Sequence, residues 1–66
     1  MSVVKVIEII AESPVGWEQA VQEAVAEAAK TVKGLKSVYV QDMQGVIEGD
    51  KIVKYRANVK ISFVVK

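Results

Sequence analysis

The C-terminal quarter of the chain alternates apolar and polar residues almost without a break. From residue 53 the apolar positions are Val53, Tyr55, Ala57, Val59, Ile61, Phe63 and Val65, and the polar ones are Lys54, Arg56, Asn58, Lys60 and Ser62. A period of two is typical of a strand with one face on a core. We therefore expect the apolar set to form the core face of a sheet.

A first strand is predicted at residues 3–10, where the sequence VVKVIEII is interrupted only by Lys5 and Glu8. A second is predicted at residues 35–48, followed by a two-residue hairpin loop at Gly49 and Asp50. Pairing Glu48 with Lys51 would place Val38 and Val40 on the core face. The same register would place Ser37, Tyr39, Gln41 and Met43 on the outer face with Lys54 and Arg56, unless a bulge at Gly45 shifts it.

Between these strands, an amphipathic helix is predicted from Trp17 onward. Its apolar positions are Ala20, Val21, Ala24, Val25, Ala28, Ala29 and Val32, at the spacing of one helix face. Because most of them are alanine, the helix can lie close to the sheet. Gly16 is the candidate N-cap, with Ser13 as the alternative, and Gly34 is placed as the glycine after the helix end.

The predicted order of elements is β-α-β-β, which makes residues 1–66 one α+β domain with a three-stranded antiparallel sheet wrapped around one helix. A domain of this size buries only roughly 60% of its unfolded surface. Yet 52% of the 66 residues are hydrophobic, and no cysteine is present to form disulfides. We therefore expect the chain to be stabilised by association with copies of itself.

Composition also limits the classes of function. The formal net charge is +1 with charges of both signs interspersed, which does not favour nucleic acid or an anionic membrane as partner. Without cysteine or histidine, and with no paired carboxylates, an enzyme is the class least expected. The lack of cysteine and of a secretory signal predicts a cytoplasmic protein.

Several segments together resemble the dodecin family. They are the opening KVIEII, the turn and helix start SPVGWEQA, and the closing YRANVKISF, in this order and spacing across nearly the whole chain. The resemblance implies a hollow homododecamer. It also implies, for the flavin-binding members, paired flavins that stack on a tryptophan of the second strand and are hydrogen-bonded by a glutamine of the third.

Both flavin-contacting positions of that pattern differ in this chain. The tryptophan position is Ser37 and the glutamine position is Arg56, while Tyr39 offers the nearest ring for stacking. Stacking of a ring on an aromatic side chain is worth roughly 1–3 kcal/mol, and about 1.4 kcal/mol is tenfold in affinity. Riboflavin or FMN is therefore expected to bind one to two decades more weakly than with the tryptophan in place.

The segments MSV.KVI.II and SP..WEQA resemble the calcium dodecin branch more closely, which implies a calcium-binding shell. Calcium takes about six to eight oxygen ligands, and the chain has no EF-hand-like run. Glu8, Glu12 and Glu18 are the candidate metal ligands, and subunits would have to share the site. We predict a non-enzymatic homododecameric calcium-type dodecin, with flavin storage or a purely structural oligomer as alternatives.

Each candidate residue also has a purely structural interpretation, which is the commoner one. Glu8 lies in an apolar strand and would pair with a lysine or arginine. For Glu12 and Glu18, solvent and the helix dipole account for a carboxylate near the turn. Trp17 is expected to anchor the helix on the sheet or at a subunit contact. Arg56, with Lys54 and Lys60, forms a basic stripe that would serve salt bridging between subunits or, alternatively, an anion site.

Overall fold

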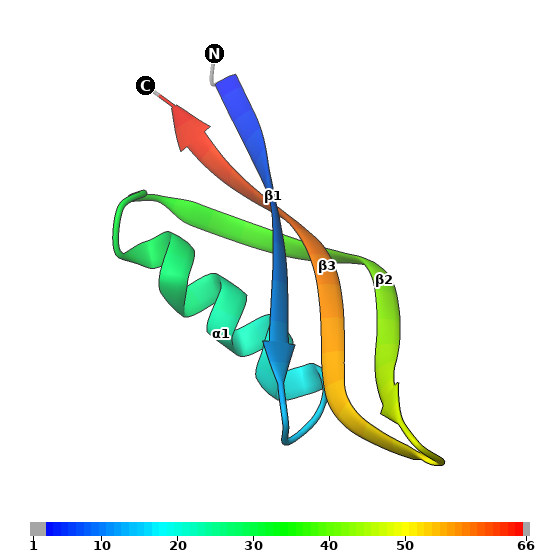
Figure 1. The fold of residues 1–66 in the computed structure, drawn as a ribbon. Coiled ribbons are helices and arrows are strands. Elements are labelled where there is room, and N and C mark those ends of the chain that lie inside the picture. The colour runs from blue at the N-terminus through cyan, green and yellow to red at the C-terminus, as the bar shows by residue number, and fades with distance from the viewer. Residues whose placement is uncertain (1–2, 66) are drawn as a thin grey trace.

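The computed structural model describes residues 3–65 and has the predicted β-α-β-β order (Figure 1). Its elements are β1 (Val3–Ser13), α1 (Trp17–Ala29), β2 (Leu35–Glu48) and β3 (Lys51–Val65). The three strands form one antiparallel sheet in the order β1-β3-β2. β1 is longer than predicted because its pairing with β3 continues to Ser13, which lies opposite Tyr55.

The two candidate caps, Ser13 and Gly16, have different roles between β1 and α1. Ser13 is buried, and its Oγ accepts a hydrogen bond of 3.0 Å from the backbone N–H of Val15. Gly16 is the N-cap of α1, in an extended conformation and with no side-chain cap bond. Ser13 therefore holds the turn, while the helix itself begins at Trp17 as predicted.

The end of α1 differs from the prediction. The helix stops at Ala29, and the following turn is closed by a hydrogen bond of 2.9 Å from the N–H of Val32 to the carbonyl of Ala28. Gly34 therefore lies beyond the position directly after the helix. It has a φ of +80°, which favours glycine, and its carbonyl accepts a bond from the N–H of Val64. The glycine thus shapes the entry into β2.

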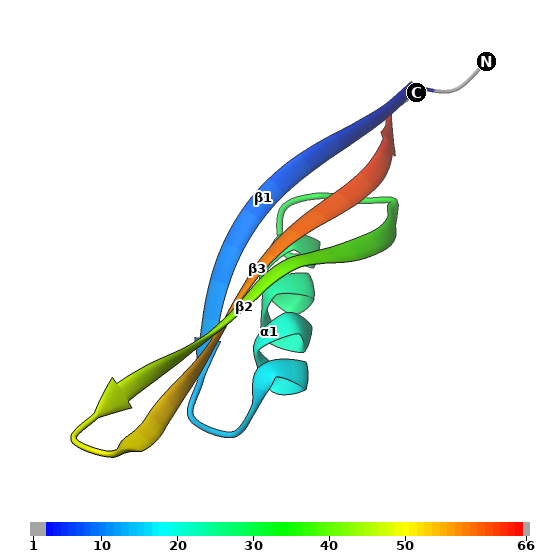
Figure 2. The ribbon, with the colours of Figure 1, turned by 90° about the vertical axis from the view of Figure 1, so that its right-hand side faces the viewer.

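The core lies where α1 covers one face of the sheet (Figure 2). Its buried side chains are Ala20, Ala24 and Ala28 of α1 with Ala57, Val59 and Ile61 of β3. The prediction of a close, alanine-mediated contact is confirmed, since Ala24 is only 1% exposed. Val53, predicted for the core face, is exposed.

The register of β2 against β3 is as predicted next to the hairpin loop and from Ser37 to Val40, and it differs from the prediction in between and at Leu35. Glu48 lies opposite Lys51, and Val38 lies opposite Ile61, as predicted. Shifts between Val40 and Asp42 and between Val46 and Ile47 move the middle segment by one residue. Met43 consequently lies opposite Ala57, on the helix side of the sheet, so its predicted outer-face position was wrong. A third shift lies between Leu35 and Ser37, and none of the three occurs at Gly45, the bulge site considered from the sequence.

The chain is elongated, with principal extents of 51 × 19 × 13 Å. Figure 2 shows the β2–β3 hairpin projecting past the start of α1, at the end of the molecule away from the termini. The Cα radius of gyration is 13.5 Å, against about 11 Å for a compact domain of this length. In residues 3–65, no helix has the length and apolarity needed to cross a bilayer.

Candidate ligand site on the outer face of the sheet

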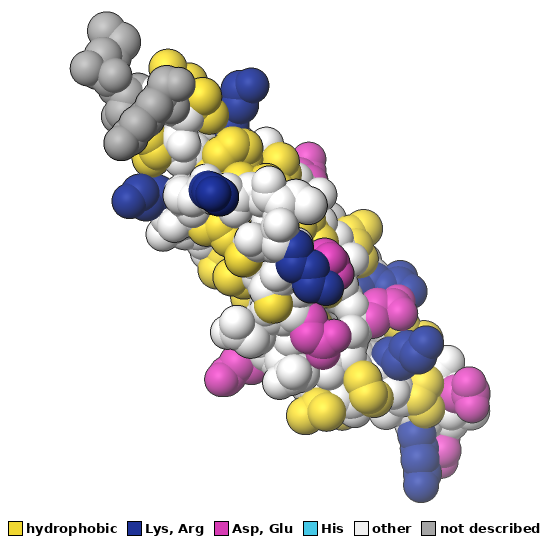
Figure 3. All heavy atoms as spheres, turned by 90° about the vertical axis from the view of Figure 1, so that its left-hand side faces the viewer, with side chains coloured by type: hydrophobic (Ala, Val, Ile, Leu, Met, Phe, Trp, Pro, Cys, Tyr) yellow, Lys and Arg dark blue, Asp and Glu magenta, His cyan; other side chains and the backbone are white. Residues whose placement is uncertain are grey.

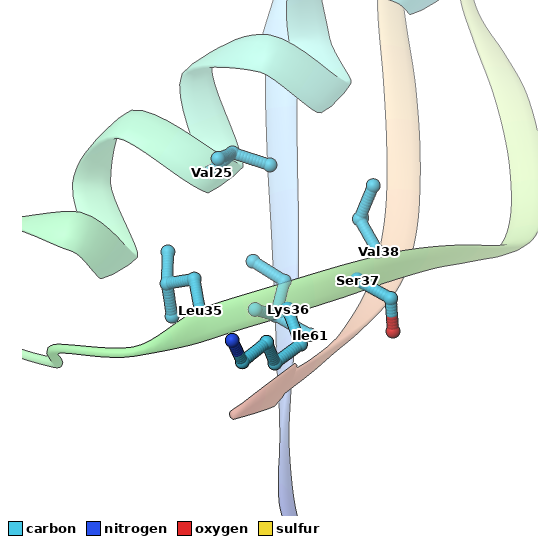
Figure 4. A pocket seen from close by; sticks show the side chains of 6 residues that line it. All are labelled: Val25, Leu35, Lys36, Ser37, Val38 and Ile61. Atoms are coloured by element: carbon cyan, nitrogen blue, oxygen red, sulfur yellow. The ribbon is translucent and has the colours of Figure 1, made fainter. Parts of the chain in front are cut away.

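Cross-strand pairing assigns the sequence-predicted ligand residues to a face of the sheet. Ser37 lies opposite Ser62 and Tyr39 opposite Lys60, so their side chains share the face turned away from α1, which we call the outer face. Figure 4 shows Ser37 directed away from the side toward which Val38 points. The predicted outer-face positions of Ser37 and Tyr39 are therefore confirmed.

At Ser37, where the family resemblance implies a tryptophan for flavin stacking, the outer face carries a pair of hydroxyl groups instead. The Oγ atoms of Ser37 and Ser62 are 2.5 Å apart and share one hydrogen bond. This pair links β2 to β3 through two small side chains. It therefore offers no flat apolar surface on which an isoalloxazine ring could stack.

Arg56, at the position of the expected glutamine, is held by an acid of the neighbouring strand. Its Nε and Nη2 lie 2.8 and 2.6 Å from Oε2 of Glu12, and Lys54 Nζ lies 3.9 Å from Oε1 of Glu12. Nη1 of Arg56 donates a longer bond, 3.3 Å, to Oε1 of Gln44. The basic stripe was predicted to form salt bridges between subunits. Two of its residues, Arg56 and Lys54, pair instead with Glu12 of the same chain.

One copy of the chain does not gather the three predicted flavin-contacting positions into a single pocket. Arg56 precedes Ser62, the partner of Ser37, by six positions of β3, which corresponds to roughly 20 Å along a strand. Tyr39 is nearer, because its partner Lys60 lies between them. Ser37, Tyr39 and Arg56 can face one ligand together only if a second copy contributes.

The three predicted metal ligands are also separated. Glu8 and Glu12 both lie on the outer face, opposite Lys60 and Arg56, but four positions of strand put them roughly 13 Å apart. Glu18 lies in the first turn of α1, which covers the other face. In residues 3–65, no three acidic side chains come close enough to hold an ion. These three glutamates therefore do not form a calcium site within one copy.

Two oxygen-bearing residues of the outer face were missed by the sequence analysis. Asn58 of β3 lies directly opposite Asp42 of β2, and its Oδ1 is buried without a hydrogen-bond partner in the described chain. On the other side of Asn58, its direct partner in β1 is Ile10, and Glu8 lies diagonally across, two positions further along β1. The displaced register at Gln41 brings Asp42 to this face, and no feature of the sequence located that bulge.

On the helix side of the sheet, an open apolar groove runs between α1 and β2. Its volume is about 440 Å³, and its apolar lining consists of Trp17, Val21, Val25, Val38, Val40 and Met43. A smaller cavity of about 200 Å³, drawn in Figure 4, continues it past Val25 and Val38 to Leu35 and Ile61. Glu18, one of the predicted metal ligands, and Gln22 also line the groove. These two polar side chains are far fewer than the six to eight oxygen ligands that calcium takes.

Trp17 closes one end of this groove and anchors the helix to the sheet. Its ring meets that of Tyr55 edge to face, with centroids 4.8 Å apart and planes at 78°. Its indole Nε1 donates a hydrogen bond of 2.9 Å to the carbonyl of Gln44. The prediction of a structural anchor rather than a ligand platform agrees with these contacts.

Comparison with known proteins identifies the family. The model of the Dodecin family matches residues 3–66. The chain belongs to the dodecin family. Calcium dodecin of Mycobacterium tuberculosis is 38% identical over 63 residues, which are 96% of this chain and 89% of that protein.

Solved dodecin structures have the same fold as this one. A mutant of the Thermus thermophilus dodecin matches with a TM-score of 0.94 at 29% identity, covering 100% of this chain and 98% of that one. The crystal structure of the calcium-chelating antigen calcium dodecin from Mycobacterium tuberculosis matches with a TM-score of 0.85 at 35% identity, covering 98% and 93%. The predicted α+β dodecin fold is thereby confirmed.

Proposed function

We propose that this dodecin is a non-enzymatic, self-assembling cytoplasmic protein that holds calcium rather than flavin in a homododecameric shell. The choice of calcium over flavin rests on the hydroxyl pair of Ser37 and Ser62, which stands where a flavin would need an aromatic ring for stacking. Similarity to a calcium dodecin over nearly the whole chain supports the same choice.

The surface of a single copy supports the proposal of assembly. The accessible surface is 4948 Å² for a mass of 7.2 kDa, whereas a compact monomer of that mass exposes about 4,100 Å². Large apolar side chains are exposed on both faces of the sheet, among them Val4, Val6 and Ile10 on the outer face. Contact with further copies would remove this apolar surface from water.

The outer face offers the oxygen atoms that fit calcium best. Glu8 and Asp42 supply carboxylates on either side of Asn58, whose Oδ1 lacks a partner in the described chain. Three side chains fall short of the six to eight oxygens that calcium takes, so water and another copy would supply the remainder. Glu12 is a weaker candidate because Arg56 and Lys54 already neutralise it.

The test combines native mass spectrometry with thermal unfolding. A ligand that binds only the folded state stabilises it by about 2.7 kcal/mol at a hundred times its dissociation constant. Calcium should therefore raise the melting temperature and a chelator should lower it. Both effects should shrink in Glu8→Gln and Asp42→Asn, and should persist in the control Glu23→Gln, on the exposed face of α1.

The same experiment separates the alternatives. If chelation leaves the melting curve unchanged while Glu8→Gln still destabilises the protein, Glu8 is paired with Lys60, its cross-strand neighbour, and the oligomer is purely structural. Flavin storage is the second candidate, favoured by the ring of Tyr39, which is 65% exposed on the outer face beside Ser37.

A further inference from the structure

The register shift in the middle of β2 places two consecutive side chains on the same face of the sheet. The residues of β2 that line the groove on the helix side are Val38, Val40 and Met43. Strict alternation would continue this series at position 42, but the shift moves it to position 43. Gln41 and Asp42 therefore both belong to the outer face. Gln44 resumes the alternation there, since its side chain is bonded to Arg56.

This bulge lies at the oxygen atom that lacks a partner. Asp42 is directly opposite Asn58, whose Oδ1 is buried and has no hydrogen-bond partner in the described chain. Bulges are frequent beside functional sites, where they change the direction of a side chain. We infer that the bulge completes the cation site of the outer face and that the side-chain oxygen of Gln41, Oε1, is a further ligand. The inference rests on the proposed calcium function and names a ligand that the proposal leaves open.

The spacing of the residues around Asn58 suits one bound ion. Cross-strand partners such as Asp42 and Asn58 have Cβ atoms roughly 5 Å apart, and the Cα of Gln41 is about 3.8 Å from that of Asp42. Two oxygens bound to the same calcium ion are at most about 5 Å apart. Glu8 lies two strand spacings from β2, roughly 10 Å, so its longer side chain has to reach over Asn58. The site thus spans all three strands with Asn58 at its centre.

The charge of the molecule favours a neutral oxygen at Gln41. Figure 3 shows acidic and basic side chains interspersed on the face that it draws, and the net charge is +1. The surface as a whole therefore does not attract a divalent cation, and binding depends on oxygens placed close to the ion. Calcium takes amide oxygens together with carboxylates. Gln41 supplies one without adding to the repulsion between Glu8 and Asp42 in the empty site.

Calorimetric titration of the assembled protein with calcium chloride tests the role of Gln41. Gln41→Met keeps the length of the side chain and removes its oxygen, so calcium should bind about tenfold more weakly. Gln41→Glu keeps the shape and adds a charge, so calcium should bind several-fold more tightly, because affinity rises with the number of charged ligands. The matched control is Gln19→Met on the exposed side of α1, which should bind calcium like the natural chain.

Deletion of Gln41 provides a second test, because it removes the bulge and preserves the faces of the neighbouring residues. Without Gln41, Val40 remains on the helix side and Asp42 remains opposite Asn58, since regular alternation now joins the two segments. The deletion variant should therefore keep the fold, as measured by circular dichroism. Its calcium affinity should fall to that of Gln41→Met.

The outcomes distinguish this inference from the proposed function. If the natural chain binds calcium and Gln41→Met binds it equally well, the inference is overturned, and the bulge only shapes the strand. The proposed function then still stands, provided that Glu8→Gln and Asp42→Asn weaken binding. Weaker binding by Gln41→Glu as well as Gln41→Met would also overturn the inference, because the position would then act through packing. A natural chain that binds no calcium would overturn both.

Discussion

The indole N–H of Trp17, the first residue of α1, donates a hydrogen bond to the carbonyl of Gln44 in β2. These residues are 27 positions apart in sequence. The bond ties the start of the helix to β2 near the β2–β3 hairpin, and the Trp17 ring packs against Tyr55 of β3 at the same place. One side chain therefore sets the position of the helix relative to both strands of the hairpin.

Replacing Trp17 with phenylalanine should lower the free energy of unfolding by about 1 kcal/mol, the usual net contribution of one hydrogen bond. Trp17→Ala should cost more, about 3 kcal/mol, because the contact with the ring of Tyr55 is lost as well. Urea unfolding followed by circular dichroism measures both, since the variants lose the only tryptophan of the chain. Equal destabilisation by the two variants would mean that the ring contact contributes nothing.

The ion pair between Glu12 and Arg56 should contribute little to stability despite its close geometry. Both side chains are partly exposed, at 35% and 39%, and exposed pairs are typically worth about 0.2–1 kcal/mol. A double-mutant cycle with Glu12→Gln and Arg56→Gln should give a coupling energy in that range. Sodium chloride should reduce it. A coupling above about 2 kcal/mol would indicate that assembly buries the pair more deeply.

Riboflavin should bind the unmodified protein weakly, because the Ser37 and Ser62 hydroxyl pair provides no stacking surface. Ser37→Trp should tighten binding by about tenfold to a hundredfold, which is the affinity equivalent of roughly 1–3 kcal/mol of stacking. Quenching of flavin fluorescence during titration measures this, with Ser37→Ala as the control that removes the hydroxyl pair and adds no ring. Submicromolar binding by the unmodified protein would assign the stacking role to Tyr39.

The contact between α1 and the sheet should tolerate no enlargement. Ala24 is 1% exposed and belongs to the core cluster with Val59 and Ile61, so Ala24→Leu should cost about 1–3 kcal/mol through displacement of the helix. Ala26→Leu, two residues away on the exposed side of the same helix, should leave stability nearly unchanged. Thermal unfolding of the two variants provides the comparison. Equal melting temperatures would show that the helix can move away from the sheet at little cost.

The order of the elements, the helix start at Trp17 and the core face of β3 could all be predicted from the sequence. They depend on local periodicity: the alternation in β3 selects Ala57, Val59 and Ile61, and the alanine spacing selects Ala20, Ala24 and Ala28. The outer-face positions of Ser37 and Tyr39 followed from counting outward from the Gly49 turn. The two register shifts that lie between the turn and Tyr39 compensate each other, and the third lies beyond Ser37.

Only the tertiary structure decided which outer-face residues meet. A strand bulge changes register by one residue at little local cost, so no sequence pattern placed Met43 beside the groove or Asp42 opposite Asn58. The pairing of Arg56 with Glu12 likewise depends on β1 lying beside β3, a contact between segments 44 positions apart. Periodicity reports which way a side chain points within its own element, whereas its partners are determined by how the elements are aligned with one another.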